Sequence, residues 1–598
     1  MQRFCFRNCL ATLVAASLVS GLFPQPSCAQ PVADAEYGAD SGFGDAEGAG
    51  AEGGTKTMGV VALSGWNPLL EDIDYLAALG GRPDQAQSIE GMIAFFTQGK
   101  GLVGLDKTKP WGVVVQGEGM SITPIVCLPV DDLPGVLALA QAFGVMSADA
   151  GGGVTELTAP QSPAPLFAKQ VGSWTYLSQT AESLDSAPAD PTAMLTDLVK
   201  DYDLGARGYV QNIPAMFREL AISSLKQGLE EGLEQEPDET DDAFETRKRM
   251  AQLQFEQIET LVEQLDQITL GIGVNESAGD GILLDFTATG LDGSDLAEQI
   301  SAMGVGSTSF AGFIDEDATM QMTFASETPK EIMAKQADQL KGTLTVVRKQ
   351  VMDAIENEAD VPNEEAREAL KSAASDLLGV YEEIVMSGVA DGAMAVTLAP
   401  DTFKMAGGAK VPSPAKVESA LKKLAAVMAK EGAPDVAWGA HTHDGVTFHA
   451  IEVPVPPEAR QDGIDPFGET LPVAVGIGAD SVYLAAGSDW LANVTAAMDA
   501  SKASGPTAAK PASLSISVES IVALGLLIET DPQRKQVVQM FADALGESDG
   551  DDHVLITVDS IERGMRYRIQ VEEGVLRGAG VMAEAAARQA GAGGPPAF

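Results

Sequence analysis

The chain has 598 residues, of which 45% are hydrophobic and 21% are charged. This is enough material for several domains with sizeable cores, and the composition is not that of a disordered chain. The 38 Lys and Arg residues face 86 Asp and Glu residues, which gives a formal net charge of −48. No stretch is dense in Lys or Arg, so the sequence excludes a nucleic-acid-binding role and disfavours electrostatic attraction to an anionic membrane. Four Cys and four His residues leave little for a multi-thiolate zinc site, a haem or a disulfide scaffold.

Residues 1–29 have the pattern of a secretory signal peptide. Arg3 and Arg7 precede a short apolar run at 10–23, and the small residues Ser27, Cys28 and Ala29 form a cleavage site. No later apolar run reaches the roughly 20 residues that a bilayer crossing needs. We therefore expect an exported protein with no transmembrane span in the mature chain. Lipid anchoring at Cys28 remains an alternative, although the residues before it lack the aliphatic residue of a lipoprotein signal.

Three segments have the composition of loose chain. Residues 30–57 repeat Gly, Ala, Asp and Glu, which predicts a disordered acidic leader. The Gly- and Pro-containing end predicts a disordered tail at 586–598, and residues 504–511 predict a short linker.

Between these segments, one order of elements occurs twice. It consists of a strand pair, a helix, a Gly-Val-Thr hairpin and a Tyr-Leu strand. In the first copy these are 111–116 with 122–130, 131–143, 153–155 and 176–177. In the second copy they are 394–398 with 402–406, a helix opened by Ser413 and Pro414, 445–447 and 483–484. A Pro-rich stretch at 454–472 makes the second copy longer and predicts a surface loop insertion.

A second unit follows each copy and contains a strand hairpin. The hairpins are predicted at 268–274 with 282–288 and at 554–558 with 565–571. In the last strand Met565, Tyr567, Ile569 and Val571 alternate with polar residues such as Arg566 and Arg568. This alternation predicts an antiparallel sheet with one wet face.

Long helices interrupt the strands. Apolar residues from Met333 to Ala354 recur at alternating steps of four and three, which predicts one apolar seam along a helix. Pro362 ends it, and a second helix carries Leu370 and Ile384. An equivalent pair is predicted at 214–234 and 243–266. Such hairpins either pack on each other and on a sheet, or leave a groove between helix and sheet for an apolar ligand or a partner helix.

The predicted fold class is α+β, internally duplicated, with antiparallel sheets, covering helices and long helical hairpins. The units are 58–200 (A1), 201–305 (B1, with a helical hairpin), 306–503 (A2, with a helical hairpin and the Pro-rich insertion) and 512–585 (B2).

Two short motifs near residue 550 match a serine nucleophile and a metal site, but the neighbouring elements and the residue spacing argue against both. Residues 546–550, Gly-Glu-Ser-Asp-Gly, match the nucleophile elbow of serine hydrolases. That motif needs a strand before Ser548 and a helix after it, whereas here a helix precedes and a strand follows. Asp549 and Asp551 in the same loop could bind a metal such as calcium, but the spacing departs from the EF-hand loop, and a solvated loop is the default interpretation.

His441, His443 and His449 form a His cluster around a predicted hairpin turn at Asp444-Gly445. Hairpin register sets His441 opposite Phe448, His443 opposite Val446 and Ala440 opposite His449. His441 and His443 then share one face while His449 points to the other, so the three cannot bind one ion. His441 and His443 remain a candidate two-His metal site.

No constellation in the sequence predicts catalysis or a cofactor. Cys127 is expected to be a small buried side chain in a strand at 125–128, and no phosphate-binding loop is present. The predicted function is therefore a non-catalytic binding or structural protein of the bacterial periplasm, cell surface or medium, with an apolar small molecule or another envelope protein as partner. The alternative is a secreted hydrolase that uses carboxylates, with Asp or Glu residues as acid and base.

Overall fold

The computed structural model describes residues 55–591, except for 142, 160–163, 232, 234, 236–240, 279–280, 303–305, 358–360, 362, 431, 457–465, 530 and 549–551. The signal predicted at 1–29, Cys28 and most of the predicted leader lie outside the described residues. So do residues 592–598 and most of the loop that holds Asp549 and Asp551.

The first half of the described chain alternates strands with helices. Its main elements are β1 (Lys56–Leu63), α2 (Trp66–Leu79), α3 (Gln85–Phe96), β2 (Trp111–Glu118), β3 (Ser121–Leu128), α4 (Leu133–Gln141), β4 (Met146–Gly151), β5 (Val154–Thr158), β6 (Leu166–Val171), β7 (Trp174–Ser178), α5 (Thr192–Val199), β8 (Leu204–Tyr209), α6 (Ala215–Glu231), α7 (Asp241–Gln264), β9 (Leu265–Val274), β10 (Gly281–Gly290) and α8 (Asp295–Ala302).

The second half continues this alternation. Its main elements are β11 (Gly306–Thr308), the 3₁₀ turn η4 (Ala311–Phe313), β12 (Met320–Glu327), α9 (Lys330–Asn357), α10 (Glu364–Ser387), β13 (Val389–Ala399), β14 (Thr402–Lys410), α11 (Pro414–Lys430), β15 (Ala437–His443), β16 (Val446–Pro454), β17 (Thr470–Ile477), β18 (Ser481–Ala486), α12 (Trp490–Ser504), β19 (Thr507–Ala509), β20 (Ala512–Ser517), α13 (Val518–Ile528), α14 (Pro532–Leu545), β21 (His553–Ile561), β22 (Gly564–Glu572) and α15 (Glu573–Gly591).

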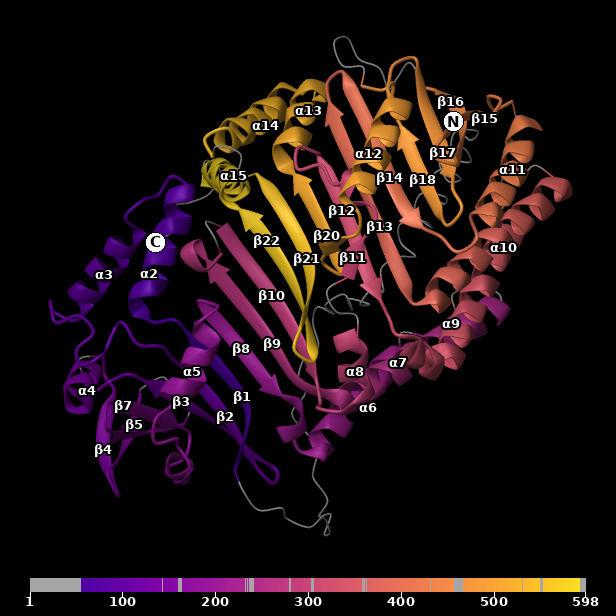
Figure 1. The fold of residues 1–598 in the computed structure, drawn as a ribbon. Coiled ribbons are helices and arrows are strands. Elements are labelled where there is room, and N and C mark those ends of the chain that lie inside the picture. Colours follow the sequence, from indigo (N-terminus) through magenta and orange to yellow (C-terminus); the bar gives the residue numbers. More distant parts are fainter. Residues whose placement is uncertain are drawn as a thin grey trace.

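Within the described residues, twenty of the strands join edge to edge in one sheet. Its N-terminal part has the order β4-β5-β6-β7-β3-β2-β1-β8-β9-β10. Its C-terminal part has the order β22-β21-β20-β12-β13-β14-β18-β17-β16-β15. β10 and β22 pair in the middle and join the two parts. Every pairing is antiparallel, and Figure 1 shows the strands side by side across the whole molecule. The predicted α+β class and the antiparallel pairing are confirmed.

Two cores lie on the same side of this sheet, beneath α5 and α12. Leu195 and Leu198 of α5 pack on Val60, Ile125 and Tyr176. The Cys127 thiol belongs to the same core, is fully buried, and burial raises its pKa to about 12. The prediction that Cys127 is a small buried side chain is confirmed.

The core beneath α12 is built in the same manner. Trp490, Val494 and Met498 of α12 pack on Phe448 and Ala485 of the strands. Phe310, directly before η4, and Phe313, the last residue of η4, complete this core.

The long helices pack mainly on one another. Leu370 and Ala373 of α10 meet Ala420 and Leu424 of α11 in an apolar cluster. Asn363 begins α10, and its side chain accepts a hydrogen bond from the backbone N–H of Ala366. The predicted helices are confirmed, and Leu370 of the second predicted helix is used in helix packing.

Two segments differ from their predictions. The linker predicted at 504–511 contains β19, which pairs with β11 in a small separate sheet because its backbone N–H and C=O groups find a partner strand. The tail was predicted to begin at residue 586, but α15 runs on to Gly591. The Ala- and Arg-containing sequence there suits a helix better than the Gly and Pro that follow it.

Candidate functional site

The central strands carry different side chains on their two faces. Residues directly opposite each other in an antiparallel ladder point to the same face. One row across five strands consists of Leu204, Ile272, Leu284, Ile569 and Ile556. A second row, two residues further along, consists of Leu270, Phe286 and Tyr567. We call these eight side chains the apolar face.

The apolar face is open to solvent. Leu270 is 50% exposed, Leu284 44% and Ile569 40%, and Leu204, Ile272, Phe286 and Ile556 are exposed to a similar degree. The rings of Phe286 and Tyr567 lie 6.4 Å apart, so neighbouring strands contact each other across this surface. Contiguous exposed apolar surface of this kind marks an interaction site in soluble proteins, because each large side chain would gain about 1.5–3 kcal/mol on burial.

The polar face of the same strands is the better covered one. Asp285 is 0% exposed, and its carboxylate accepts hydrogen bonds from Arg568 Nε at 2.8 Å and Nη2 at 2.7 Å. The Tyr202 hydroxyl donates to the same carboxylate at 3.0 Å. The alternation predicted for β22 is confirmed. Asp285 is buried on the polar face, where the Arg566 and Arg568 side chains are 32% and 26% exposed, whereas Ile569 on the apolar face is 40% exposed.

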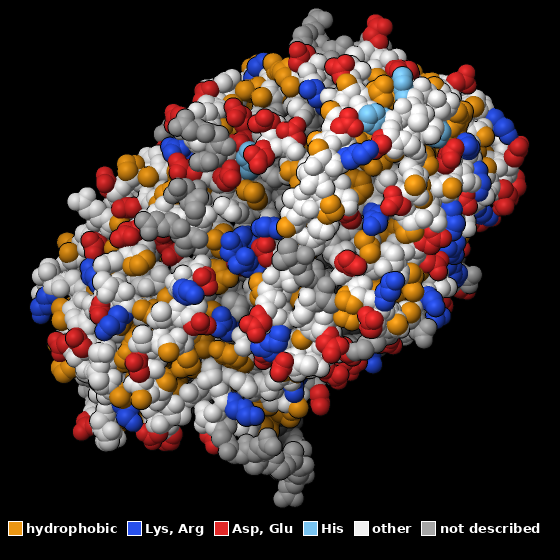
Figure 2. Space-filling model, viewed as in Figure 1, with side chains coloured by type: hydrophobic (Ala, Val, Ile, Leu, Met, Phe, Trp, Pro, Cys, Tyr) orange, Lys and Arg blue, Asp and Glu red, His pale blue; other side chains and the backbone are white. Residues whose placement is uncertain are grey.

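Further charged residues extend the polar face. Arg566 Nη2 lies 3.1 Å from Asp559, and Lys510 Nζ lies 3.2 Å from the same carboxylate. These cations hold the pKa of Asp559 below its ordinary value, although burial alone would raise it. Figure 2 shows Lys and Arg side chains gathered near the middle of the visible surface, where Figure 1 places β22, while acidic side chains are scattered widely.

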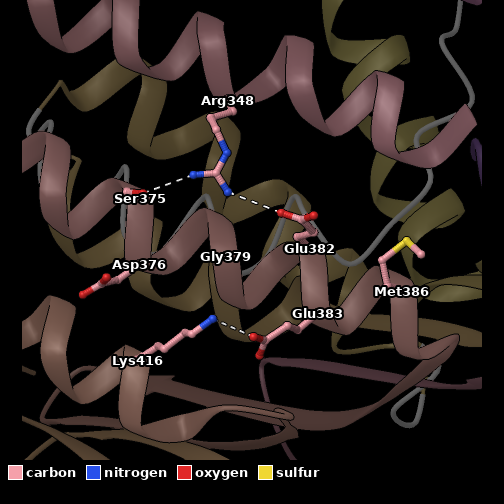
Figure 3. A pocket seen from close by; sticks show the side chains of 8 residues that line it. All are labelled: Arg348, Ser375, Asp376, Gly379, Glu382, Glu383, Met386 and Lys416. Carbon is pink, nitrogen blue, oxygen red and sulfur yellow. Dashed lines mark hydrogen bonds and ion pairs between the residues drawn. The ribbon is translucent and has the colours of Figure 1, made fainter. Parts of the chain in front are cut away.

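A polar pocket of about 530 Å³ opens between α9, α10 and α11 (Figure 3). Arg348 donates to Ser375 Oγ at 3.1 Å and lies 3.4 Å from Glu382, and Lys416 Nζ lies 2.6 Å from Glu383. The hydrogen bond from Lys416 holds the pKa of Glu383 below its ordinary value. Acids and bases of this pocket therefore neutralise each other, and the pairs link three helices. The apolar groove that the sequence offered as an alternative would lie between helix and sheet, whereas this polar pocket lies between three helices.

The His cluster divides as its hairpin register predicted. His441 is opposite Phe448 and His443 is opposite Val446, across a turn in which Asp444 and Gly445 both have positive φ. The His443 Nε2 atom lies 2.9 Å from Asp499 of α12, and the His441 ring packs 5.8 Å from Trp490 of the same helix. His449 points to the other face, where Nε2 lies 3.5 Å from Glu418 of α11.

One detail of that hairpin differs from the prediction. Ala440 does not pair with His449, because the ladder shifts between Ala437 and His441. Gly439, with a φ of 64°, turns its N–H onto His449 Nδ1 at 2.9 Å. His449 is therefore a buried structural group. His443 is hydrogen-bonded to Asp499, and the His441 ring packs against Trp490.

The acidic loop after α14 falls partly outside the described residues. Asp549 and Asp551, the predicted metal candidates, lie outside the described residues. Ser548 is buried after the end of α14, and β21 follows it, so helix precedes strand as the sequence predicted. This order is the reverse of a nucleophile elbow.

The structure assembles a charged cluster around His553 that sequence reasoning missed. His553 Nδ1 lies 3.1 Å from Asp552 and 3.3 Å from Glu572. The other oxygen of Asp552 accepts hydrogen bonds from Ser517 Oγ at 2.7 Å and from the N–H of Glu519 at 2.8 Å. The cluster thus ties the first turn of α13 to the β21–β22 hairpin. Extending the hairpin register outward from Arg563-Gly564 would have brought His553 and Glu572 together.

Asp72 of α2 is a buried carboxyl with a shifted pKa. Burial raises its pKa to about 7, and the charges of Asp203 and Glu71 contribute. This is a property that catalytic acids share with buried structural carboxyls.

Comparison of the chain with protein-family models, with curated proteins and with solved structures gives no match. Among the described helices, none is both long and apolar enough for a bilayer crossing. The described residues also contain no group of three or more His, Cys, Asp or Glu side chains arranged to hold a metal.

Proposed function

We propose that this protein is an exported, non-catalytic binding protein whose apolar face receives an apolar ligand with a long acyl chain. The exposed row from Leu204 to Ile556 is the observation that carries the proposal. Neighbouring strands lie about 4.8 Å apart, so five side chains span about 19 Å, a length that suits an extended acyl chain. Each methylene removed from water would contribute about 0.8 kcal/mol.

Export to the periplasm, the cell surface or the medium is part of this proposal. Its support is the signal-like pattern of residues 1–29. A carrier of apolar molecules outside the cytoplasm needs a surface that stays soluble when empty, and the formal charge of −48 provides it.

We also propose that the two halves of the chain are copies of one unit. The strand order from β4 to β10 has the same pattern of hairpins and crossovers as the order from β15 to β22. In both, an early strand (β1 or β12) pairs with the strand that follows two helices (β2 or β13) and with a late strand (β8 or β20). Tyr176 and Tyr483 lie in the cores beneath α5 and α12.

The repeat assigns the long helices differently from the sequence interpretation. By position between paired strands, α9 and α10 correspond to α2 and α3, and α6 and α7 correspond to α13 and α14. The sequence equated α9 and α10 with α6 and α7 because length and periodicity were the only criteria. A crystal structure in which residues 111–185 failed to superpose on 393–499, outside the Pro-rich insertion, would contradict the repeat.

The binding proposal is tested by titrating the purified protein with a fluorescent long-chain fatty acid. Leu284→Asn and Ile569→Asn should weaken binding at least several-fold, because each places an amide in the centre of the row. Ile314→Asn is the matched control, since Ile314 is 38% exposed but follows η4 on the α12 side of the sheet. Equal weakening by the control, or no binding by the wild type, would refute the proposal. Native mass spectrometry of protein from its own host would then identify any co-purifying lipid.

The alternative is the carboxylate hydrolase, for which Asp72 is the best-supported acid because of its raised pKa. Hydrolysis of a glycan or ester panel that Asp72→Asn abolishes would favour this alternative over the binding protein.

A further inference from the structure

The two halves of the sheet meet in a ladder without irregularity. β10 and β22 pair from Gly281 opposite Glu572 to Thr289 opposite Gly564. Asp285 and Arg568 are directly opposite each other at the centre of this ladder.

These two residues hold equivalent positions in the two halves. Leu177 and Leu484 are equivalent residues of the two proposed copies, in the Tyr-Leu strands. From Leu177, stepping each time to the residue directly opposite on the next strand leads through β3, β2, β1, β8 and β9 to Phe286. From Leu484, the same steps lead through β14, β13, β12, β20 and β21 to Ile569. Phe286 and Ile569 are therefore equivalent, and so are their neighbours Asp285 and Arg568. Equivalent residues that face each other across an antiparallel pair lie on a local two-fold axis.

We infer that the Asp285–Arg568 ion pair selects the partner of the last strand in each half. It favours pairing of β10 with β22 over pairing of either strand with the same strand of a second molecule. This inference rests on the proposed duplication. A strand that can pair across a two-fold axis can also pair with the same strand of another molecule. Two β10 strands in this register would set Asp285 against Asp285, and two β22 strands would set Arg568 against Arg568. Like charges in a buried position disfavour both pairings.

The apolar-face positions of the ladder do not discriminate. In self-pairing they would set Leu284 against Phe286, Ile282 against Ala288, Tyr567 against Ile569 and Met565 against Val571. All of these pairs are apolar and of compatible size. The remaining positions would set Leu283 against Thr287, Gly281 against Thr289, Arg566 against Gln570 and Gly564 against Glu572, and none of these pairs joins two like charges. Asp285 and Arg568 therefore occupy the one position at which self-pairing sets like charges directly opposite each other.

The geometry of the pair suits this role. Two parallel hydrogen bonds from one guanidinium fix its orientation on the carboxylate, and the Tyr202 hydroxyl occupies a further lone pair. A self-pairing would leave Tyr202 with one carboxylate of a repelling pair, or would leave the Arg568 guanidinium without a carboxylate.

The test uses the full chain with a neutral pair, Asp285→Leu together with Arg568→Met. After refolding from denaturant, size-exclusion chromatography with light scattering should show a fraction of dimers and larger species roughly tenfold above the wild type, because nothing then rejects self-pairing. Asp559→Asn is the matched control. Asp559 is directly opposite Arg566 in register and pairs with Arg566 and Lys510 within the second half, so its variant should assemble like the wild type.

A folded neutral-pair variant that assembles like the wild type would overturn the inference. If this variant does not fold, charge reversal keeps the test open. The single variants Asp285→Arg and Arg568→Asp should each misassemble alone. Refolded together, they should form a one-to-one complex in which β10 of each chain pairs with β22 of the other. The double variant, with both charges reversed in one chain, should behave as the wild type. Failure of the single variants to combine, while the double reversal folds, would equally overturn the inference. Failure of the duplication itself would appear instead in the superposition of the two halves.

Discussion

At the scale of single residues, two buried titratable groups act on stability in opposite pH directions. Asp72 binds a proton more tightly in the folded chain than in the unfolded chain, whereas His449 binds one less tightly. Neither touches the apolar face, so both can be changed without altering the proposed ligand surface.

Asp72→Asn should stabilise the protein at pH 8 relative to pH 5. The carboxyl has a pKa of about 7 when folded and 3.8 as its ordinary value. Between these values the folded chain binds a proton that the unfolded chain has lost, so the free energy of unfolding decreases as pH rises. The variant should remove this loss, on the order of 2–4 kcal/mol, as measured by urea unfolding at both pH values. Glu118→Gln, on the surface at the end of β2, is the control, and an identical pH profile for Asp72→Asn and wild type would contradict the prediction.

His449 should remain neutral at pH 7 with its proton on Nε2. Burial lowers its pKa, Glu418 opposes this, and Nδ1 is already an acceptor for the Gly439 N–H. Since the unfolded histidine gains a proton first, stability should be present above the ordinary pKa of about 6.5 and decline as pH falls below it. His449→Gln should flatten this acid-side decline in thermal unfolding between pH 5 and pH 7. An NMR titration that gave His449 a pKa above its ordinary value of about 6.5 would refute the assignment.

At the scale of elements, we expect buried residues of the long helices to contribute to stability and not to the proposed ligand binding. Leu370 of α10 is 6% exposed in the cluster with α11, and Leu220 of α6 is 61% exposed. The two residues therefore form a matched pair of leucines on long helices.

Leu370→Ala should lower the free energy of unfolding by about 2–5 kcal/mol, because it leaves a cavity between α10 and α11. Leu220→Ala should change it by less than about 0.5 kcal/mol. Acyl-chain binding by Leu370→Ala should match that of the wild type at a temperature where the variant is folded. A loss of binding without a loss of stability would mean that these helices line the ligand site after all.

At the scale of the whole molecule, one continuous sheet couples the two halves. The β10–β22 ladder joins them, and Arg563 adds a hydrogen bond from its side chain to the Gly290 carbonyl at 3.2 Å. α15 and α8 lie at opposite ends of this ladder (Figure 1).

Chemical unfolding should therefore be a single transition for both halves. Tryptophan fluorescence reports on Trp174 in the first half and Trp490 in the second, and single-Trp variants should give the same midpoint. Two midpoints separated by more than the experimental error would show that the halves unfold independently.

The sequence by itself determined the local structure of this protein. Strand pairs such as β2–β3, the turn at Asp444-Gly445 and the start of α11 at Pro414 all depend on neighbours within a few residues, so periodicity and turn chemistry sufficed. The opposite faces of His441 and His449 followed from the same local register.

Only the tertiary structure decided which face of the sheet is covered. The alternation in β22 distinguishes Ile569 from Arg568, but it does not state that Arg568 pairs with the buried Asp285, 283 positions earlier. The His553 cluster and the β10–β22 joint depend likewise on contacts between segments far apart in the chain. Such contacts arise when strands find partners across the sheet, and no local pattern of residues encodes that choice of partner.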